Sequence, residues 1–161
     1  MRLGIDFGTT RVVVAADGGN YPLVDFARRT ARCASGSRRR WPSHGGELLR
    51  LSRRAVQGQR DWTVLRSLKR LLKASGPATR LDLAGGQAPV IELATGLFTA
   101  LSRKLRACST LSPGRSETFD VIIGVPANAN SNQWFLTGEA FRAAGFQVLG
   151  MLNERSAARV G

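Results

Sequence analysis

Residues 3–10 read LGIDFGTT, a short apolar strand with one carboxylate, Asp6, that runs into a glycine and two threonines. Gly8 lets the backbone turn so that successive N–H groups point into one concavity, which holds phosphate oxygens. The hydroxyls of Thr9 and Thr10 add further donors. Asp6 can hold a water molecule of a hydrated Mg²⁺ that bridges two phosphates. The stretch therefore predicts a phosphate-binding loop with magnesium, and the alternative is a polar hairpin turn without a ligand.

Strands are expected on both sides of this loop. Residues 2–7 and 11–16 are rich in Leu, Ile, Phe and Val, which favour strands. A turn signal at 17–19 precedes residues 21–26, YPLVDF, which read as a third strand. We therefore expect an antiparallel meander that carries the loop between its first two strands.

The middle of the chain predicts two helices and a hairpin. From Asp61 on, apolar residues recur at three- and four-residue spacing until Gly76-Pro77 stops the helix. The run LDLAGGQAPV indicates a small hairpin around Gly85-Gly86. A second amphipathic helix follows, and its apolar stripe consists of Leu93, Leu97, Leu101, Leu105 and Cys108.

The last third of the chain predicts a βαβ unit. FDVIIGVP and FQVLGML are continuous apolar runs, typical of strands buried on both faces. Between them Asn130 can cap a helix, Gln133 can return the bond as a capping box, and Gly145 ends the helix. Two strands joined through a helix are expected to be parallel. The predicted fold class is therefore α/β, with a mixed sheet that joins the antiparallel meander to parallel strands and with flanking helices.

The charge of the chain is concentrated in one segment. The net charge is +13 over 161 residues, and residues 28–54 hold nine arginines against one acid, Glu47. Nine arginines could contact nucleic-acid phosphates, so a basic nucleic-acid-binding protein is an alternative function. The arginines form no helical stripe, however, and no known DNA- or RNA-binding motif occurs.

Other bulk features favour an ordinary cytoplasmic domain. With 43% apolar residues the chain can form a core. We find neither a signal peptide nor an apolar stretch long enough to cross a membrane, and expect no membrane partner. Cys33 and Cys108 lie far apart without metal-ligand spacing, so free thiols in a reducing compartment are expected.

The loop at 3–10 resembles the first phosphate-binding loop of the actin-like ATPase superfamily, which includes sugar kinases, actin and DnaK-type heat-shock chaperones. The end of the chain resembles the chaperones' connecting segment, in which a strand ending in Val-Pro-Ala leads to a helix, Ala-Gly, a strand and Asn-Glu-Pro-x-Ala-Ala. Here it reads VIIGVPANANSNQWFLTGEAFRAAGFQVLGMLNERSAARVG. The resemblance covers 1–26 and about 56–161. It favours divergent bacterial DnaK-related proteins of the heat shock protein 70 family over sugar kinases.

The resemblance implies a lobe of the actin-like ATPase (ribonuclease H-like) fold that binds ATP and Mg²⁺. Asp6 would hold the Mg²⁺ through water. Thr9 and Thr10 would contact the phosphates beside Gly8. Arg11 stands where a small or polar residue is common in the family, and it can still help to hold phosphate.

Three further positions receive roles from the resemblance. Lys69, in SLKRLL, would reach the γ-phosphate and orient the attacking water; Glu154, in NERSAA, would lie near that water; Pro126 matches a proline linked to interdomain signalling. Each also has a structural reading. The lysine can belong to a solvated basic face, the glutamate can face a helix dipole, and the proline can end a strand.

Parts of the chain depart from the family. The matched parts of residues 1–161 correspond only to the first lobe of the family's nucleotide-binding domain, and neither the second phosphate loop nor the peptide-binding domain has a counterpart. The Arg-rich stretch 27–55 matches nothing in the family and reads as a degenerate or frame-shifted insertion. Arg155 replaces the proline after Asn-Glu. In the family the nucleotide lies in a cleft between two lobes, of which this sequence matches one. We therefore expect weak Mg-ATP binding without efficient ATP hydrolysis.

The partners follow from this reading. ATP or ADP is expected to bind, whereas unfolded-protein clients and co-chaperones are expected only if further domains complete the protein. Non-specific binding of nucleic acid is expected from the charge. A non-catalytic remnant or scaffold, exposing an apolar face that a second lobe would cover, is the remaining alternative.

Overall fold

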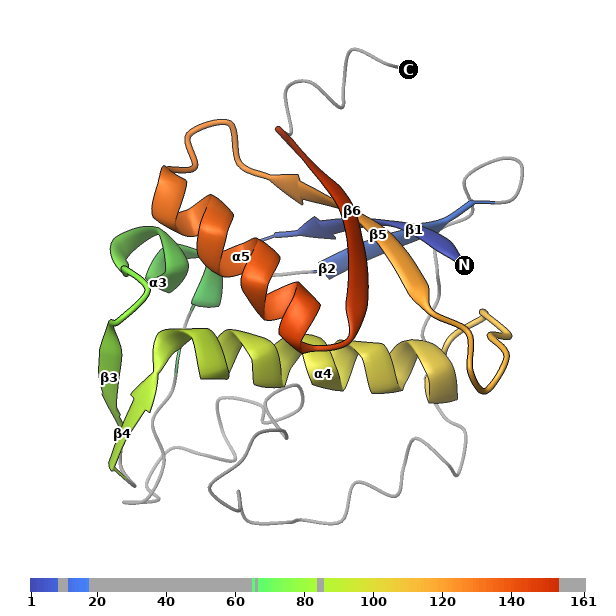
Figure 1. Cartoon of the computed structure of the whole chain (residues 1–161), viewed down its shortest axis with the longest axis horizontal. Coiled ribbons are helices and arrows are strands. Elements are labelled where there is room, and N and C mark those ends of the chain that lie inside the picture. Colours follow the sequence, from blue (N-terminus) through green and yellow to red (C-terminus); the bar gives the residue numbers. More distant parts are fainter. Residues whose placement is uncertain (9–11, 18–64, 66, 84–85, 154–161) are drawn as a thin grey trace.

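A computed structural model of the chain describes residues 1–8, 12–17, 65, 67–83 and 86–153 (Figure 1). Within these residues the chain forms a four-stranded sheet, a two-stranded hairpin and three helices. In chain order the elements are β1 (Arg2–Phe7), β2 (Val12–Ala16), α3 (Leu68–Ala74), β3 (Arg80–Leu83), β4 (Gly86–Pro89), α4 (Val90–Cys108), β5 (Phe119–Val125), α5 (Ser131–Ala143) and β6 (Phe146–Asn153).

The larger sheet is mixed, as expected. Its strand order is β2-β1-β5-β6, with β1 antiparallel to β2 and parallel to β5, and with β5 parallel to β6. The parallel pair β5–β6 is joined through α5, which confirms the predicted βαβ unit. The structure is therefore of the mixed α/β class. The predicted third strand of the meander, 21–26, lies outside the described residues.

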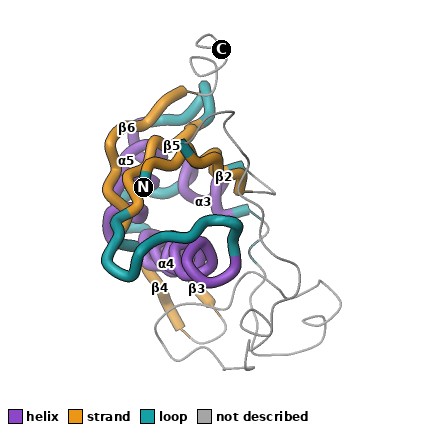
Figure 2. Tube along the Cα trace, turned by 90° about the vertical axis from the view of Figure 1, so that its right-hand side faces the viewer, coloured by secondary structure: helices purple, strands orange, loops and turns teal. Residues whose placement is uncertain are grey.

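The helices pack against one face of this sheet. Along β1 the odd-numbered Leu3, Ile5 and Phe7 are buried, and the residues between them are exposed. Phe98 of α4 meets Phe7 edge-on at 5.1 Å between ring centroids and stacks on Phe141 of α5 at 3.8 Å. Figure 2, turned by 90°, shows α4 nearly end-on beneath the sheet. Since aromatic side chains bury large apolar areas, these three rings join sheet and helices into one core.

The opposite side of the sheet, which we call the outer face, is not covered as the apolar runs predicted. Burial alternates along β5: Ile123 is fully buried and its neighbour Ile122 is 42% exposed. Leu152 of β6, the ladder partner of Gly124, is 45% exposed. The expectation of strands buried on both faces is therefore wrong, because the described helices all lie on one side. The outer face comprises Arg2, Gly4, Asp6, Val13, Ala15, Asp120, Ile122, Gly124, Gln147, Gly150 and Leu152.

The middle of the chain agrees with the expected elements except for one boundary. The helix expected from Asp61 begins only at Leu68, because Ser67 adopts an extended conformation and its Oγ caps the helix by accepting from Arg70 N. Leu65 is not helical. The hairpin β3–β4 confirms the one predicted around Gly85-Gly86. Gly86 is the first residue of β4, and residues 84 and 85 lie outside the described part.

Helix α4 confirms the second amphipathic helix with a shifted apolar stripe. Leu93, Leu101 and Leu105 are buried as predicted, but Leu97 is only partly buried. Phe98 is fully buried one position further on. The side chain of Cys108 lies outside the described residues. None of the helices in the described ranges is long and apolar enough to cross a membrane.

Helix α5 has the predicted ends but not the predicted capping box. Asn130 Oδ1 accepts from Gln133 N at 2.8 Å, which confirms the N-cap. Gln133 does not return the bond to Asn130; its Nε2 donates to the carbonyl of Lys69 in α3 instead. Gly145 follows the helix with φ of +86°, a conformation that glycine adopts without strain, and confirms the predicted stop.

Candidate functional site

The carboxyl ends of three parallel strands meet at one end of the larger sheet. β1 ends before Gly8, β5 ends before Pro126, and β6 ends at Asn153, and their parallel registers place these ends together. In Figure 1, α3 and the first turn of α5 lie beside the ends of β1 and β5. Ligands of open α/β sheets bind outside the carboxyl ends of the strands. We therefore take this end of the sheet as the candidate site.

Asp6 lies on the outer face, one residue before the end of β1. Its partners in the ladders are Val13 on β2 and Gly124 on β5. A Cβ placed on Gly124 would lie 3.7 Å from Asp6 Oδ1 and 3.6 Å from Asp6 Cα. Because Gly124 has no side chain, nothing from this residue covers the surface next to the carboxylate. The sequence pointed to Asp6 but not to Gly124; a glycine inside an apolar strand, where a backbone or ligand approaches closely, was the available signal.

This arrangement fits a magnesium ion that is held through water. Within the described ranges, no cluster of three His, Cys, Asp or Glu residues offers a cation a complete set of protein ligands. Mg²⁺ keeps several of its waters and is bound by one or two carboxylates together with the phosphates of its nucleotide. A single exposed carboxylate beside free space, as at Asp6, suits that mode of binding.

Several predicted site residues lie outside the described part of the chain. These are Thr9, Thr10 and Arg11 of the phosphate loop and Glu154 after β6. The residues that flank the loop are described: Gly8 follows β1 and is half-buried, and Phe7 pairs directly with Val12.

The position of Lys69 is set by α3, to which it belongs, and by a hydrogen bond from α5. It stands in the first turn of α3 and is half-buried, whereas Arg70 and Lys73 on the same helix are exposed. The carbonyl of Lys69 accepts a hydrogen bond from Gln133 Nε2 at 3.3 Å, which ties α3 to α5. The partial burial of its side chain distinguishes Lys69 from the exposed Arg70 and Lys73.

Asp6 and Lys69 belong to different layers of the molecule. Asp6 is on the outer face, while α3 packs through its buried Leu72 with the helix layer on the other side of the sheet. A ligand that touches both side chains therefore has to lie across the carboxyl end of the sheet. Pro126 begins the turn between β5 and α5, and its carbonyl accepts from Ala129 N at 3.0 Å.

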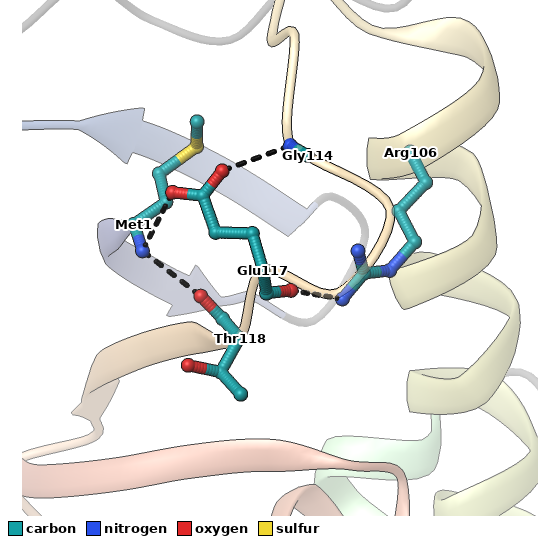
Figure 3. A network of polar contacts seen from close by, with 5 residues as sticks. All are labelled: Met1, Arg106, Gly114, Glu117 and Thr118. Carbon is teal, nitrogen blue, oxygen red and sulfur yellow. Dashed lines mark hydrogen bonds and ion pairs between the residues drawn. The ribbon is translucent and has the colours of Figure 1, made fainter.

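A second polar network lies at the opposite end of the sheet, where β1 and β5 begin (Figure 3). The amino group of Met1 donates to the Thr118 carbonyl at 2.9 Å and pairs with Glu117 Oε1 at 3.1 Å. The other carboxylate oxygen of Glu117 accepts from Gly114 N at 3.0 Å. The Gly114 N–H, and after it the Met1 ammonium, lower the pKa of Glu117. Because all these groups are paired with one another, we assign the network to stability.

A comparison of the chain with models of known protein families gave no match. A functional assignment therefore has to rest on the residues and on their arrangement at the carboxyl end of the sheet.

Proposed function

We propose that this chain forms the ATP-binding lobe of a DnaK-like molecular chaperone with an actin-like ATPase fold. In this proposal the loop at residues 3–10 binds the phosphates of Mg-ATP. The observation that carries the proposal is the position of Asp6 beside Gly124, at the carboxyl end of a sheet in which an antiparallel pair is extended by parallel strands. The sequence resemblance at both ends of the chain supports the same assignment.

The chemistry of such a site is mainly positioning. Bound magnesium supplies positive charge that neutralises phosphate oxygens. Asp6 would hold the ion through water from the outer face, where Gly124 has no side chain to crowd the ion's water shell. Lys69, half-buried in the first turn of α3, would donate to the terminal phosphate. The activity that we propose for these residues is the binding of Mg-ATP.

The test is a titration with a fluorescent ATP analogue, with Mg²⁺ or with a chelator, at low and high salt. Asp6→Ala is expected to weaken Mg²⁺-dependent binding by about tenfold or more, the range seen when a group that orients a metal's ligands is removed. The matched control is Asp120→Ala. This change removes the same charge from the same outer face, but near the start of β5, where Arg2 is the partner of Asp120 in the ladder.

The control separates a site from charge alone. A chain of net charge +13 attracts any polyphosphate, and such binding weakens steeply with salt. Binding that ignores Mg²⁺, disappears at high salt and falls equally in both variants would contradict the proposal. It would leave non-specific attraction by the basic residues as the explanation.

A further inference from the structure

The N-cap residue of α5 and one side chain in its first turn hold α3 by its main chain. Asn130 Nδ2 donates to the Lys73 carbonyl at 2.8 Å, and Gln133 Nε2 donates to the Lys69 carbonyl at 3.3 Å. The two acceptors are four residues apart, and therefore lie one helical turn apart along α3. The first turn of α5 thus fixes α3 at two points in succession.

The two bonds serve different purposes. Lys73 lies in the last turn of α3, where carbonyls lack helical partners, so the bond from Asn130 completes the helix end. Lys69 lies in the first turn, where a carbonyl already has the N–H of the residue four positions later as its partner. The bond from Gln133 is therefore not needed to complete α3. Its remaining effect is to fix where Lys69 stands.

Gln133 is also an unfavourable residue for packing alone. It is 2% exposed, and its Oε1 has no hydrogen-bond partner among the residues that the structure describes. A buried acceptor without a partner lowers the stability of a fold, and an apolar side chain of similar length avoids that cost. Packing therefore does not explain why residue 133 is a glutamine. The hydrogen bond from Gln133 to the Lys69 carbonyl does explain it.

We infer that Gln133 is a positioning residue that holds Lys69 at the carboxyl end of the sheet, so that the Lys69 ammonium reaches the terminal phosphate of a bound nucleotide. This inference rests on the proposed function, from which it takes the role of Lys69. Gln133 itself does not touch the nucleotide. It acts through the main chain of α3, with Asn130 fixing the next turn.

The test compares the affinities of the chain for Mg-ATP and Mg-ADP analogues in Gln133→Met, Lys69→Ala and the double variant. Only ATP has the terminal phosphate, so the ratio of the two affinities reports on Lys69. We expect Lys69→Ala to lower ATP affinity about tenfold, the range for a hydrogen bond to a charged group, and to spare ADP. Gln133→Met should lower ATP affinity about threefold, the range for one hydrogen bond, and also spare ADP.

Two readouts separate positioning from a structural role. The melting temperature of Gln133→Met should equal or exceed that of the parent, because the substitution removes an unpaired buried acceptor. The double variant should bind ATP no more weakly than Lys69→Ala, because the two residues act as one unit. Thr137→Val, a change at the buried polar position one turn further along α5, is the control and should leave the affinity ratio unchanged.

Three outcomes would overturn the inference. An unchanged ATP-to-ADP ratio in Gln133→Met would do so, and so would an equal loss for both nucleotides with a lower melting temperature. An unchanged ratio in Lys69→Ala would show that Lys69 does not contact the terminal phosphate, so Gln133 would have no such residue to position. These results are distinct from failure of the proposed function, in which the parent itself shows no Mg²⁺-dependent binding and Asp6→Ala behaves as Asp120→Ala does. In that last case the inference falls with the proposal.

Discussion

At the scale of single residues, the candidate site depends on the glycine at position 124, which has no side chain. Gly124 lies beside Asp6 in the ladder between β1 and β5, and it keeps the surface next to the carboxylate free. A Cβ there would be in ordinary van der Waals contact with Asp6, so a methyl group fits without moving the backbone. A branched side chain would extend over the carboxylate.

Two substitutions at Gly124 test this geometry. Gly124→Ala should leave the free energy of unfolding unchanged or raise it by up to about 1 kcal/mol, because glycine is costly inside a strand. Gly124→Val should fold as well, since valine favours strands, yet bind the Mg-ATP analogue more weakly by crowding the ion's water shell. Urea unfolding and the fluorescence titration measure the two effects. Equal Mg²⁺-dependent affinity in both variants would contradict the role of the free space.

At the scale of elements, β5 shows how the sheet is used. Its side chains alternate between the helix-covered face and the outer face, so one apolar run serves two environments. Ile122 and Ile123 are identical neighbours on opposite faces, 42% exposed and fully buried respectively. They form a natural matched pair.

We expect Ile123→Ala to lower the free energy of unfolding by about 2–5 kcal/mol, through lost burial and the cavity left in the core. Ile122→Ala should lower it by less than about 1 kcal/mol, because that side chain already contacts water. Denaturant unfolding of both variants under the same conditions measures the difference. Similar losses at the two positions would mean that the outer face of β5 is covered in solution.

At the scale of the whole molecule, the two ends of the sheet are built differently. Asp6 and Gly124 lie near the carboxyl end, and the network around Glu117 lies at the amino end. In that network Arg106 of α4 donates to the Glu117 carbonyl at 2.7 Å and lies 4.4 Å from the Phe119 ring centroid. Glu117 and Arg106 therefore join the chain's amino group, α4 and β5 (Figure 3).

Because of this network, we expect the stability of the fold to change with pH in the acidic range. The Gly114 N–H and the Met1 ammonium hold the pKa of Glu117 in the folded protein below its ordinary value of about 4.5, so folding favours its ionised form. Its contribution is present above the unfolded pKa and is lost as the pH falls through the folded pKa. As the pH is lowered below about 4.5, we expect the melting temperature of the parent to fall more steeply than that of Glu117→Gln. Near neutral pH, Glu117→Gln should be less stable than the parent. Thermal unfolding between pH 3 and pH 7 measures both curves, and parallel curves would contradict the role of the carboxylate.

The sequence determined the local features of this protein. Periodicity gave α4 and the βαβ unit, the cap residue Asn130 marked the start of α5, and Gly145 marked its end. Asp6 could be singled out because a carboxylate in an apolar strand is unusual. Each of these signals lies within a few neighbouring residues, whose spacing and conformational preferences act locally.

Only the tertiary structure decided what these elements meet. It left the outer faces of β5 and β6 without a helix among the described residues, paired Gln133 with a carbonyl 64 residues away, and put Gly124 beside Asp6. An apolar run has the same composition whether one face or two are covered, and a glutamine can cap its own helix or reach another. Such choices are made by packing between segments that are distant in the chain, so no local pattern determines them.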